Sequence, residues 1–516
     1  MNLLILIENR KIKKWHLNCI KEIEKKFNKI IILNYNYKKK YDWSKILYYL
    51  IKTISNPNTE KNFFNQMIGN FKFYDQEIFY NNKFFKLDQS FDNICKKNRV
   101  DIVLRFGLGI IKTNSKIPIL SFHHGDPSKY RGRPSGFYEL YNSEKMMGQI
   151  VQIISSNLDG GKILAYGESK VEPNSYSKTL ENSYSISHIL LKKALHRIKK
   201  KEFIKKRKNG KIYFLPSNTK VFLLTVKLFF RSLNIILLKF FYIKKWKIAV
   251  IQYKKKFQFN IIKKFFSKKK EIYISPNYNF IADPFFLKNN LIFEITKKFS
   301  QKGKIAIFNN KKISLIKSNS QHISFPSTFN LKGKNKDLIF PEIASWSTPK
   351  LFELRDQKLK IFKNIKIKDN KRILDPILFF KNKIYYIFGN DIKYPNILCL
   401  WIAKKLDDKF YPHPSSPVRL SPNGSRMAGK IIELNGKLFR VGQNNELFYG
   451  NGLVFFKIDK INAKEFVESY YTSLNLSKFK GPHTFSLNEK NKEFALDYYE
   501  NKFEIFALLK KINPFH

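Results

Sequence analysis

The pattern of apolar positions divides the chain into two parts. In the first part, apolar runs typical of buried strands cover residues 2–7, 29–33, 100–107, 117–122 and 148–155. Stretches with helical spacing lie between several of them, for example residues 13–27. This alternation predicts a Rossmann-like α/β domain, with a mostly parallel sheet that helices cover on both faces. We expect this domain to span residues 1–195.

The second part, residues 245–516, repeats a short hairpin pattern. Five segments each place a turn of Asn, Gly or Lys between two apolar strands: "LKNNLIFEI", "LKGKNKDLIF", "FKNKIYYIF", "LNGKLFRVG" and "LNEKNKEFALDYY". Their second strands begin at Leu291, Leu338, Ile384, Leu438 and Phe494. A hairpin repeat of roughly 50 residues is typical of propeller blades. The sequence therefore predicts an all-β five-bladed propeller.

The segment 196–244 between the two parts is basic and then apolar. It opens with "RIKKKEFIKKRKNGK" and continues as "VFLLTVKLFFRSLNIILLKFFYI", residues 221–243. Lys227, Arg231 and Asn234 form one narrow polar stripe at helical spacing, and the charges argue against a spanning helix. Two interpretations stay open. The helix is a linker between domains, or residues 197–243 contact the inner face of a membrane peripherally.

Composition narrows the function classes. With 516 residues, 43% hydrophobic and 16% aromatic, the chain has material for at least two packed domains, which excludes global disorder. The net charge is +57, which suits nucleic acid, an anionic membrane or the residue bias of AT-rich coding. Because the lysines are spread along the chain, we expect no nucleic-acid partner.

Cysteine usage and the N-terminus bear on location. Cys19, Cys95 and Cys399 lie far apart, without disulfide or metal-site spacing, so we expect a reducing compartment and no metal. The N-terminal apolar run is short and lacks a leading basic region, so it is interpreted as a strand and not a signal peptide. We therefore expect a cytoplasmic protein.

The stretch "SFHHGDPSKYRG", residues 121–132, carries the candidate chemistry of the first part. Strand alternation points Ser121 and His123 to one side, at an edge where α/β enzymes bind ligands. "SNLDGG" then places Asp159 in a tight turn after the next strand. A carboxylate beside an imidazole fixes its tautomer and favours its charged form, so the pair suits acid–base work.

These motifs resemble the folate-dependent formyltransferase family, whose members act on methionyl-tRNA, glycinamide ribonucleotide and sugar amines. The resemblance covers residues 1–195, and "KYRG" followed by "LDGG" is its most specific part. It implies that His123 and Asp159 are catalytic and that 10-formyltetrahydrofolate is the formyl donor. It also implies that "FGLGII" lines the folate pocket, through Gly107, Leu108, Gly109, Ile110 and Ile111.

The sequence departs from the family at the oxyanion position. Ser121 stands where the family has an asparagine, and His124 and Gly125 replace Pro-Ser. We expect Ser121 to serve as a weaker catalytic donor, or a neighbour to take its place. We assign substrate binding to His124, Tyr130, Arg131 and Arg133, whose cations suit a substrate phosphate. The alternative is that these cations are only a solvated loop face.

The second part resembles the N-terminal domain of glucosamine inositolphosphorylceramide transferases, through "IADPFF", "LDP", "GKLFRVGQN" and "GPHTF". It is also similar to five-bladed glycosidase propellers, in which acids from successive blades converge. That likeness makes Asp283, Glu342 and Asp375 candidate acids for holding or hydrolysing a sugar. The alternative is that Asp-Pro is turn chemistry at a blade entrance.

The leading hypothesis is a formyltransferase that modifies the amine of a nucleotide-linked amino sugar in surface-polysaccharide synthesis. One alternative places the chemistry in the propeller, as a glycosyltransferase or glycosidase beside a degenerate formyltransferase-like domain. A further alternative is a scaffold that binds glycan without catalysis.

Overall fold

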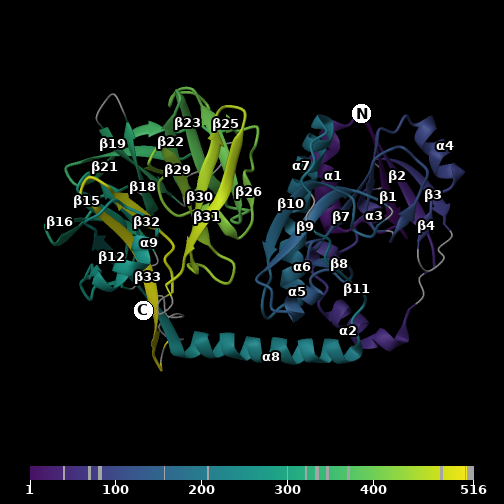
Figure 1. Ribbon diagram of the computed structural model, residues 1–516, viewed down its shortest axis with the longest axis horizontal. Coiled ribbons are helices and arrows are strands. Elements are labelled where there is room, and N and C mark those ends of the chain that lie inside the picture. Colours follow the sequence, from purple (N-terminus) through teal and green to yellow (C-terminus); the bar gives the residue numbers. More distant parts are fainter. Residues whose placement is uncertain are drawn as a thin grey trace. The chain divides into compact units, whose positions relative to one another are not determined.

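The computed structural model describes residues 1–516 apart from 39–40, 68–70, 79–83, 108, 156, 206–207, 299, 301, 320–321, 332–335, 344–347, 369–371, 477–479, 506 and 508–516. The chain forms two compact units, Met1–Leu233 and Asn234–His516 (Figure 1). The segment 196–244, for which the sequence predicts a linker, is divided between them.

The first unit is built on one seven-stranded sheet, in the order β10-β9-β7-β5-β1-β2-β3. Its strands are β1 (Asn2–Glu8), β2 (Lys29–Asn36), β3 (Lys72–Glu77), β5 (Ile102–Arg105), β7 (Ile119–His123), β9 (Met146–Ile153) and β10 (Lys162–Lys170). The pairs from β7 to β3 are parallel, and β9 and β10 join antiparallel at one edge. The predicted, mostly parallel α/β sheet is confirmed.

Helices cover both faces of this sheet. Helix α4 (Gln89–Lys97) packs Phe91 and Ile94 into a core with alternate residues of the central strands. Helix α1 (Lys14–Ile23) contacts the opposite face, where Trp15 meets Phe122 of β7. The remaining helices of this unit are α2 (Ile46–Ile54), α3 (Phe64–Met67), α5 (Phe137–Tyr141), α6 (Tyr176–Ser185) and α7 (Ser187–Lys200), and α7 packs on α1.

The segment after α7 returns to the first unit. Strand β11 (Lys211–Tyr213) pairs in parallel with β8 (Tyr130–Gly132), and a second short ladder joins β4 (Phe85–Lys86) to β6 (Ile111–Lys112). Helix α8 (Asn218–Phe241) follows and continues from the first unit into the second. The predicted linker therefore supplies a strand beside the "KYRG" loop.

The second unit consists of five antiparallel sheets, which are the five predicted blades (Figure 1). The first four blades are β14–β17 (Tyr278–Leu287, Asn290–Lys297, Lys304–Asn309, Lys312–Leu315), β18–β21 (Ser324–Leu331, Lys336–Glu342, Lys350–Arg355, Lys358–Asn364), β22–β26 (Ile373–Lys381, Ile384–Asp391, Ile397–Ala403, Tyr411–Pro412, Arg419–Leu420) and β27–β31 (Asn423–Met427, Ile432–Leu434, Lys437–Asn444, Gly452–Ile461, Phe466–Leu474). The predicted second strands are β15, β19, β23, β29 and β33.

The fifth blade closes the ring with strands from both ends of the unit. It combines β12 (Tyr242–Gln252) and β13 (Lys270–Glu271) with β32 (Phe485–Asn488) and β33 (Glu493–Phe503), and the short helix α9 (Asn260–Phe265) lies between β12 and β13 in sequence. Strand β12 pairs antiparallel with β33 along its whole length. A shared blade of this kind ties the two ends of the unit together and closes the ring, and each blade keeps only a short outer edge.

Candidate functional site

His123 and Asp159 meet at the carboxyl end of β7. The imidazole Nδ1 lies 3.3 Å from Asp159 Oδ2, and both side chains are largely buried. The imidazole Nε2 lies 2.8 Å from the Tyr130 carbonyl oxygen, and the Gly132 N–H donates to Asp159 Oδ2 at 2.8 Å. Because a carbonyl oxygen only accepts, Nε2 carries a hydrogen in this contact, and Nδ1 faces the Asp159 carboxylate. The imidazole and the carboxylate are thus held in contact, each by a backbone partner.

Gly125 permits this placement of the imidazole. A Cβ at Gly125 would lie 2.7 Å from His123 Nε2, so a larger residue would displace the ring. Glycine at this position, where the formyltransferase motif has serine, therefore has a steric reason in this chain.

Ser121 lies beside Arg105 on the neighbouring parallel strand. Arg105 donates to Ser121 Oγ from Nη2 at 2.6 Å and from Nε at 3.2 Å, and also to the Gly109 carbonyl oxygen. Burial lowers the pKa of Arg105 to about 10, against the attraction of Asp159 and Glu8. The oxyanion position predicted for Ser121 thus contains a fixed cation.

The segment predicted to bind folate follows Arg105 directly. Gly107 has φ 80°, and a Cβ there would collide with Glu8, so the position requires glycine. The Phe85 N–H donates to the Ile110 carbonyl oxygen at 2.8 Å. Ile111 is buried in the core that α4 covers, and Leu108 lies outside the described residues.

The four residues predicted to bind substrate have different environments. His124 packs among aromatic rings, 4.7 Å from Tyr184 between centroids, and burial lowers its pKa to about 3. The Tyr130 hydroxyl donates to Glu144 at 3.0 Å. Arg131 donates to the Leu158 carbonyl oxygen and so anchors the turn that carries Asp159, whereas Arg133 is exposed. Arg133 is the one of these four whose side chain is free of the protein core.

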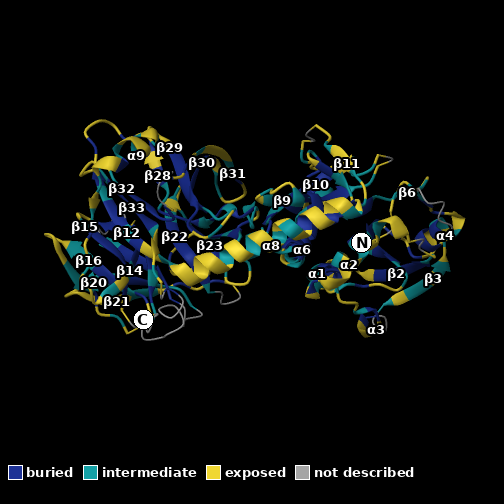
Figure 2. Ribbon diagram, turned by 90° about the horizontal axis from the view of Figure 1, so that it is seen from below, coloured by how far each residue is buried: buried dark blue, intermediate teal, exposed yellow. Residues whose placement is uncertain are grey.

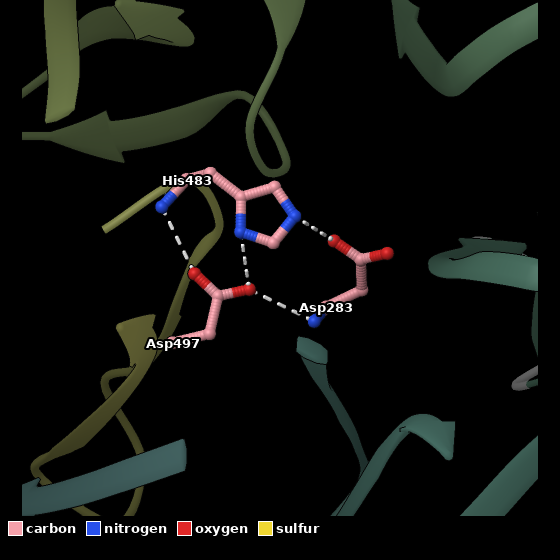
Figure 3. Close-up of side chains that lie close together, drawn as sticks. All are labelled: Asp283, His483 and Asp497. Atoms are coloured by element: carbon pink, nitrogen blue, oxygen red, sulfur yellow. Dashed lines mark hydrogen bonds and ion pairs between the residues drawn. The ribbon is translucent and has the colours of Figure 1, made fainter. Parts of the chain in front are cut away.

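Buried charges gather in the second unit between the first and fifth blades (Figure 3). His483 Nε2 lies 3.2 Å from Asp283 Oδ1, and Nδ1 lies 2.8 Å from Asp497 Oδ2. Burial alone would lower the pKa of His483, but Asp497 and Asp283 raise it to about 10. Burial opposes ionisation of Asp283, yet the imidazolium holds the pKa of that carboxyl below its usual range.

The ligand atoms of these three residues lie within 4.8 Å of one another, the spacing of a metal site. Both imidazole nitrogens already face carboxylates, and the Asp283 N–H donates to Asp497 Oδ2 at 2.9 Å. A protonated imidazole satisfies this geometry without an ion. The cluster is therefore described as a charged triad.

Three more carboxylates join the triad. Asp375 accepts from Arg426 Nε at 2.7 Å, and Glu342 accepts from Arg372 Nη2 at 3.0 Å. Burial raises the pKa of Asp375 to about 6, and burial together with the neighbouring Asp283 raises the pKa of Glu294 well above its usual range. Glu342 and Asp283 also raise the pKa of Asp375, so the three predicted acids are close enough to interact electrostatically. Each has a cationic partner: His483 for Asp283, Arg372 for Glu342 and Arg426 for Asp375.

The two Asp-Pro aspartates share an unusual backbone. Asp283 has φ 54° and Asp375 has φ 46°, and each lies at a register shift in the first strand of its blade. A carboxylate from the preceding blade accepts each backbone N–H: Asp497 at 2.9 Å and Glu342 at 3.2 Å. Left-handed backbone at non-glycine residues stores strain, and such strain clusters at functional sites.

Sequence reasoning missed several residues of both sites. Arg105 stands at the end of an apolar strand, and that position was its only signal. His483 lies within the quoted "GPHTF", and Asp497 lies in the fifth hairpin repeat, but neither motif showed that they would meet. Glu294 and Arg426 gave no distinct signal.

Most of the propeller unit is similar to one known protein family. Residues 265–492 match the family model described as glucosamine inositolphosphorylceramide transferase 1, N-terminal. The chain is 24% identical over 208 residues to the protein of that name from Arabidopsis thaliana, covering 37% of this chain and 27% of the relative. The relative from Oryza sativa subsp. japonica is 23% identical over 208 residues. The chain thus spans about a quarter of the length of these relatives.

Solved structures similar to this chain include formyltransferases. An N-formyltransferase from Helicobacter canadensis, in complex with folinic acid and dTDP-3-aminofucose, is 15% identical, with TM-score 0.29, covering 45% of this chain and 81% of that one. WlaRD, a sugar 3N-formyltransferase crystallised with dTDP and 5-N-formyl-THF, is 12% identical, with TM-score 0.29, covering 62% and 98%.

Proposed function

We propose that the first unit transfers a formyl group from 10-formyltetrahydrofolate to an amine. The acceptor in this proposal is a nucleotide-linked amino sugar used in surface-polysaccharide synthesis in the cytoplasm. The observation that carries the proposal is the His123–Asp159 contact at the carboxyl end of β7, next to Ser121 and Arg105. This edge of a parallel sheet is where α/β proteins bind ligands.

The donor would bind along the backbone of residues 107–110. Arg105 and Phe85 fix the carbonyl oxygens of Gly109 and Ile110, so the backbone of these two residues is held in place after the end of β5. Such an edge fits the flat, hydrogen-bonding ring of a pterin. When bound, the folate supplies the formyl carbon that the amine attacks.

The residues of this chain would transfer the proton of the attacking amine and stabilise the charge on the formyl oxygen. Attack by the amine releases a proton, and the His123–Asp159 pair can accept it and return it to the leaving nitrogen. Negative charge develops on the formyl oxygen, and a cation or N–H fixed beforehand stabilises it. Arg105, held by Ser121, supplies that cation. Arg133, being exposed, suits a phosphate of the acceptor.

The experiment follows formylation of dTDP- and UDP-linked amino sugars by mass spectrometry, with 10-formyltetrahydrofolate as donor. We expect His123→Ala and Asp159→Asn each to lower the rate roughly 100-fold or more. His196→Ala, at an exposed histidine of α7, is the matched control and should keep the rate. Wild-type protein that binds no folate analogue and formylates no acceptor would contradict the proposal.

A second candidate function belongs to the propeller. We propose that its buried acid cluster binds or processes a glycan, as a glycosidase, a glycosyltransferase or a non-catalytic module. The supporting observation is that Asp375 and Glu294 keep raised pKa values beside ionised Asp283, because such a set offers both acid and base forms. Tyr449, 45% exposed and 5.0 Å from His483 between ring centroids, offers a face for a sugar.

The test is binding and cleavage of an oligosaccharide panel. Asp283→Asn and Asp375→Asn should abolish both, whereas Asp356→Asn, at an exposed turn, should have no effect. Binding that survives both site substitutions would place the glycan elsewhere.

A further inference from the structure

Helix α8 has its polar and apolar faces in the reverse of the usual order. Two of its cations contact other elements of the first unit: Lys227 Nζ donates to the Tyr141 carbonyl oxygen at 3.0 Å, and Arg231 donates to the Pro173 carbonyl oxygen at 2.9 Å and to Ser143 Oγ at 2.7 Å. In a soluble protein the apolar side of a surface helix faces the core. Here Lys227 and Arg231, the two cations of the polar stripe predicted from the sequence, face the protein instead, whereas Asn234 is exposed.

Most of α8 is exposed (Figure 2). Of its 24 residues, Val221 and Leu224 are the buried ones. The exposed large apolar residues are Phe222, Leu223, Phe229, Phe230, Leu233, Ile236, Leu237, Leu238, Phe240 and Phe241. An apolar surface of this size on a soluble domain marks a binding surface.

A second helix extends this surface at the start of α8. The Leu47 N–H of α2 donates to Asn218 Oδ1 at 3.2 Å, which joins the two helices within the first unit. Helix α2 also presents apolar residues outward, with Leu50 55% and Ile54 76% exposed, and Trp43, just before it, is 78% exposed. We call the exposed apolar residues of α8 and α2, with Trp43, the α8–α2 surface.

The chemistry around this surface fits a lipid bilayer. Residues 217–245 contain no acidic residue and six basic ones, and Lys220 and Lys245 are exposed near the two ends of the helix. Bulky aromatic side chains flanked by lysines suit the headgroup region and anionic lipids.

Among the described residues, α8 is also the one helix whose length and composition would allow it to cross a membrane. Crossing would pull Lys227 and Arg231 away from their carbonyl partners and into hydrocarbon, which is costly. Lying along the surface keeps those contacts and buries the apolar face.

We propose that the α8–α2 surface lies in the headgroup region of a membrane, with α8 parallel to the bilayer and its polar stripe still bound to the first unit. The protein would then act at a lipid surface, whichever reaction its two units perform. This geometry also accounts for the exposure of Trp43.

The test adds the full chain to preformed vesicles of phosphatidylcholine, with and without phosphatidylglycerol, and measures co-sedimentation. We expect binding that the anionic lipid strengthens. Phe229→Glu with Phe230→Glu should weaken vesicle binding about 10-fold or more, since the burial of each phenyl ring in the bilayer contributes to the free energy of binding. Tyr273→Glu with Tyr470→Glu, at exposed aromatic residues of the propeller, is the matched control and should bind as wild type.

Trp43 provides an independent measurement. Its emission should shift to shorter wavelength on vesicle binding and be quenched by brominated lipid, and Trp43→Phe should remove that change. Wild-type protein that stays in the supernatant would overturn the proposal. A second result would also overturn it. If the wild type does not bind vesicles and the Phe229/Phe230 variant has a lower molar mass than the wild type by light scattering, the surface joins copies of the chain.

Discussion

At the scale of single residues, Arg105 changes the chemistry expected at the end of β7. The resemblance to formyltransferases implies an asparagine amide at position 121, and serine is a shorter donor. In this chain the guanidinium of Arg105 contacts Ser121 Oγ through two nitrogens, so the serine hydroxyl serves to hold a cation. A charged donor interacts more strongly with a developing oxyanion than a neutral amide does.

Substitutions at Ser121 test this exchange of roles. Ser121→Asn keeps an oxygen that can accept from Arg105 and adds amide N–H donors, so we expect the formylation rate to be kept or raised. Ser121→Ala removes the acceptor and frees the guanidinium, and we expect a loss of roughly 100-fold or more, the range for an oxyanion donor. Equal rates for Ala and Ser would show that Arg105 works without this contact.

Strand alternation and turn composition were enough to bring His123 and Asp159 forward as a pair, because both depend on local geometry. Phe122 and His124 indeed share the other side of the strand, with ring centroids 5.8 Å apart. The contacts of His483 could not be predicted in the same way. It meets Asp283 two hundred residues earlier in the chain, and such pairing depends on the closure of the ring.

At the scale of elements, the second strands of the blades were the most predictable feature. They carry short, nearly continuous runs of buried residues, most of them apolar, between turn residues, a signal that is local and strong. The outer strands lack that pattern because they bury little apolar surface. In β25 (Tyr411–Pro412), for example, both residues are exposed. The positive-φ aspartates of β14 and β22 were also hidden, since Asp-Pro occurs equally in ordinary turns.

The triad links the first and fifth blades in a pH-dependent way. The pKa of His483 rises from 6.5 to about 10 in the folded chain, so the folded state binds this proton more tightly. Its stabilising contribution is complete below pH 6.5 and is lost progressively as the pH rises to about 10. We expect the melting temperature of His483→Gln to lie furthest below that of the wild type near pH 6 and to approach it near pH 10.

His413→Gln is the control for this titration. His413 is also buried, but its Nε2 contacts the Asn462 carbonyl oxygen and not a carboxylate. Its difference from the wild type should not shrink between pH 6 and pH 10. A constant difference for His483→Gln as well would show that the imidazole does not carry the charge that the triad requires.

At the scale of the whole molecule, ring closure is the feature on which the propeller depends. The match to the transferase family ends at residue 492, just before β33 begins at Glu493. That strand pairs with β12 and also carries Asp497 of the triad.

Deletion of residues 493–516 should therefore unfold the propeller although four blades remain complete. The measurement is the near-ultraviolet circular dichroism and the protease resistance of the fragment 234–492 within the shortened chain. Leu496→Asp, in the middle of the same strand, should act in the same direction. A shortened chain that keeps a cooperative propeller transition would contradict this expectation.

The pairing of β12 with β33 also has a consequence for synthesis on the ribosome. Strand β12 is synthesised about 240 residues before its partner β33. At 5–20 residues per second this interval lasts roughly 10–50 s. During that interval its unpaired backbone edge is open to any other strand, including those of neighbouring nascent chains. Cells that make this protein would therefore benefit from a holding chaperone until the last strand arrives.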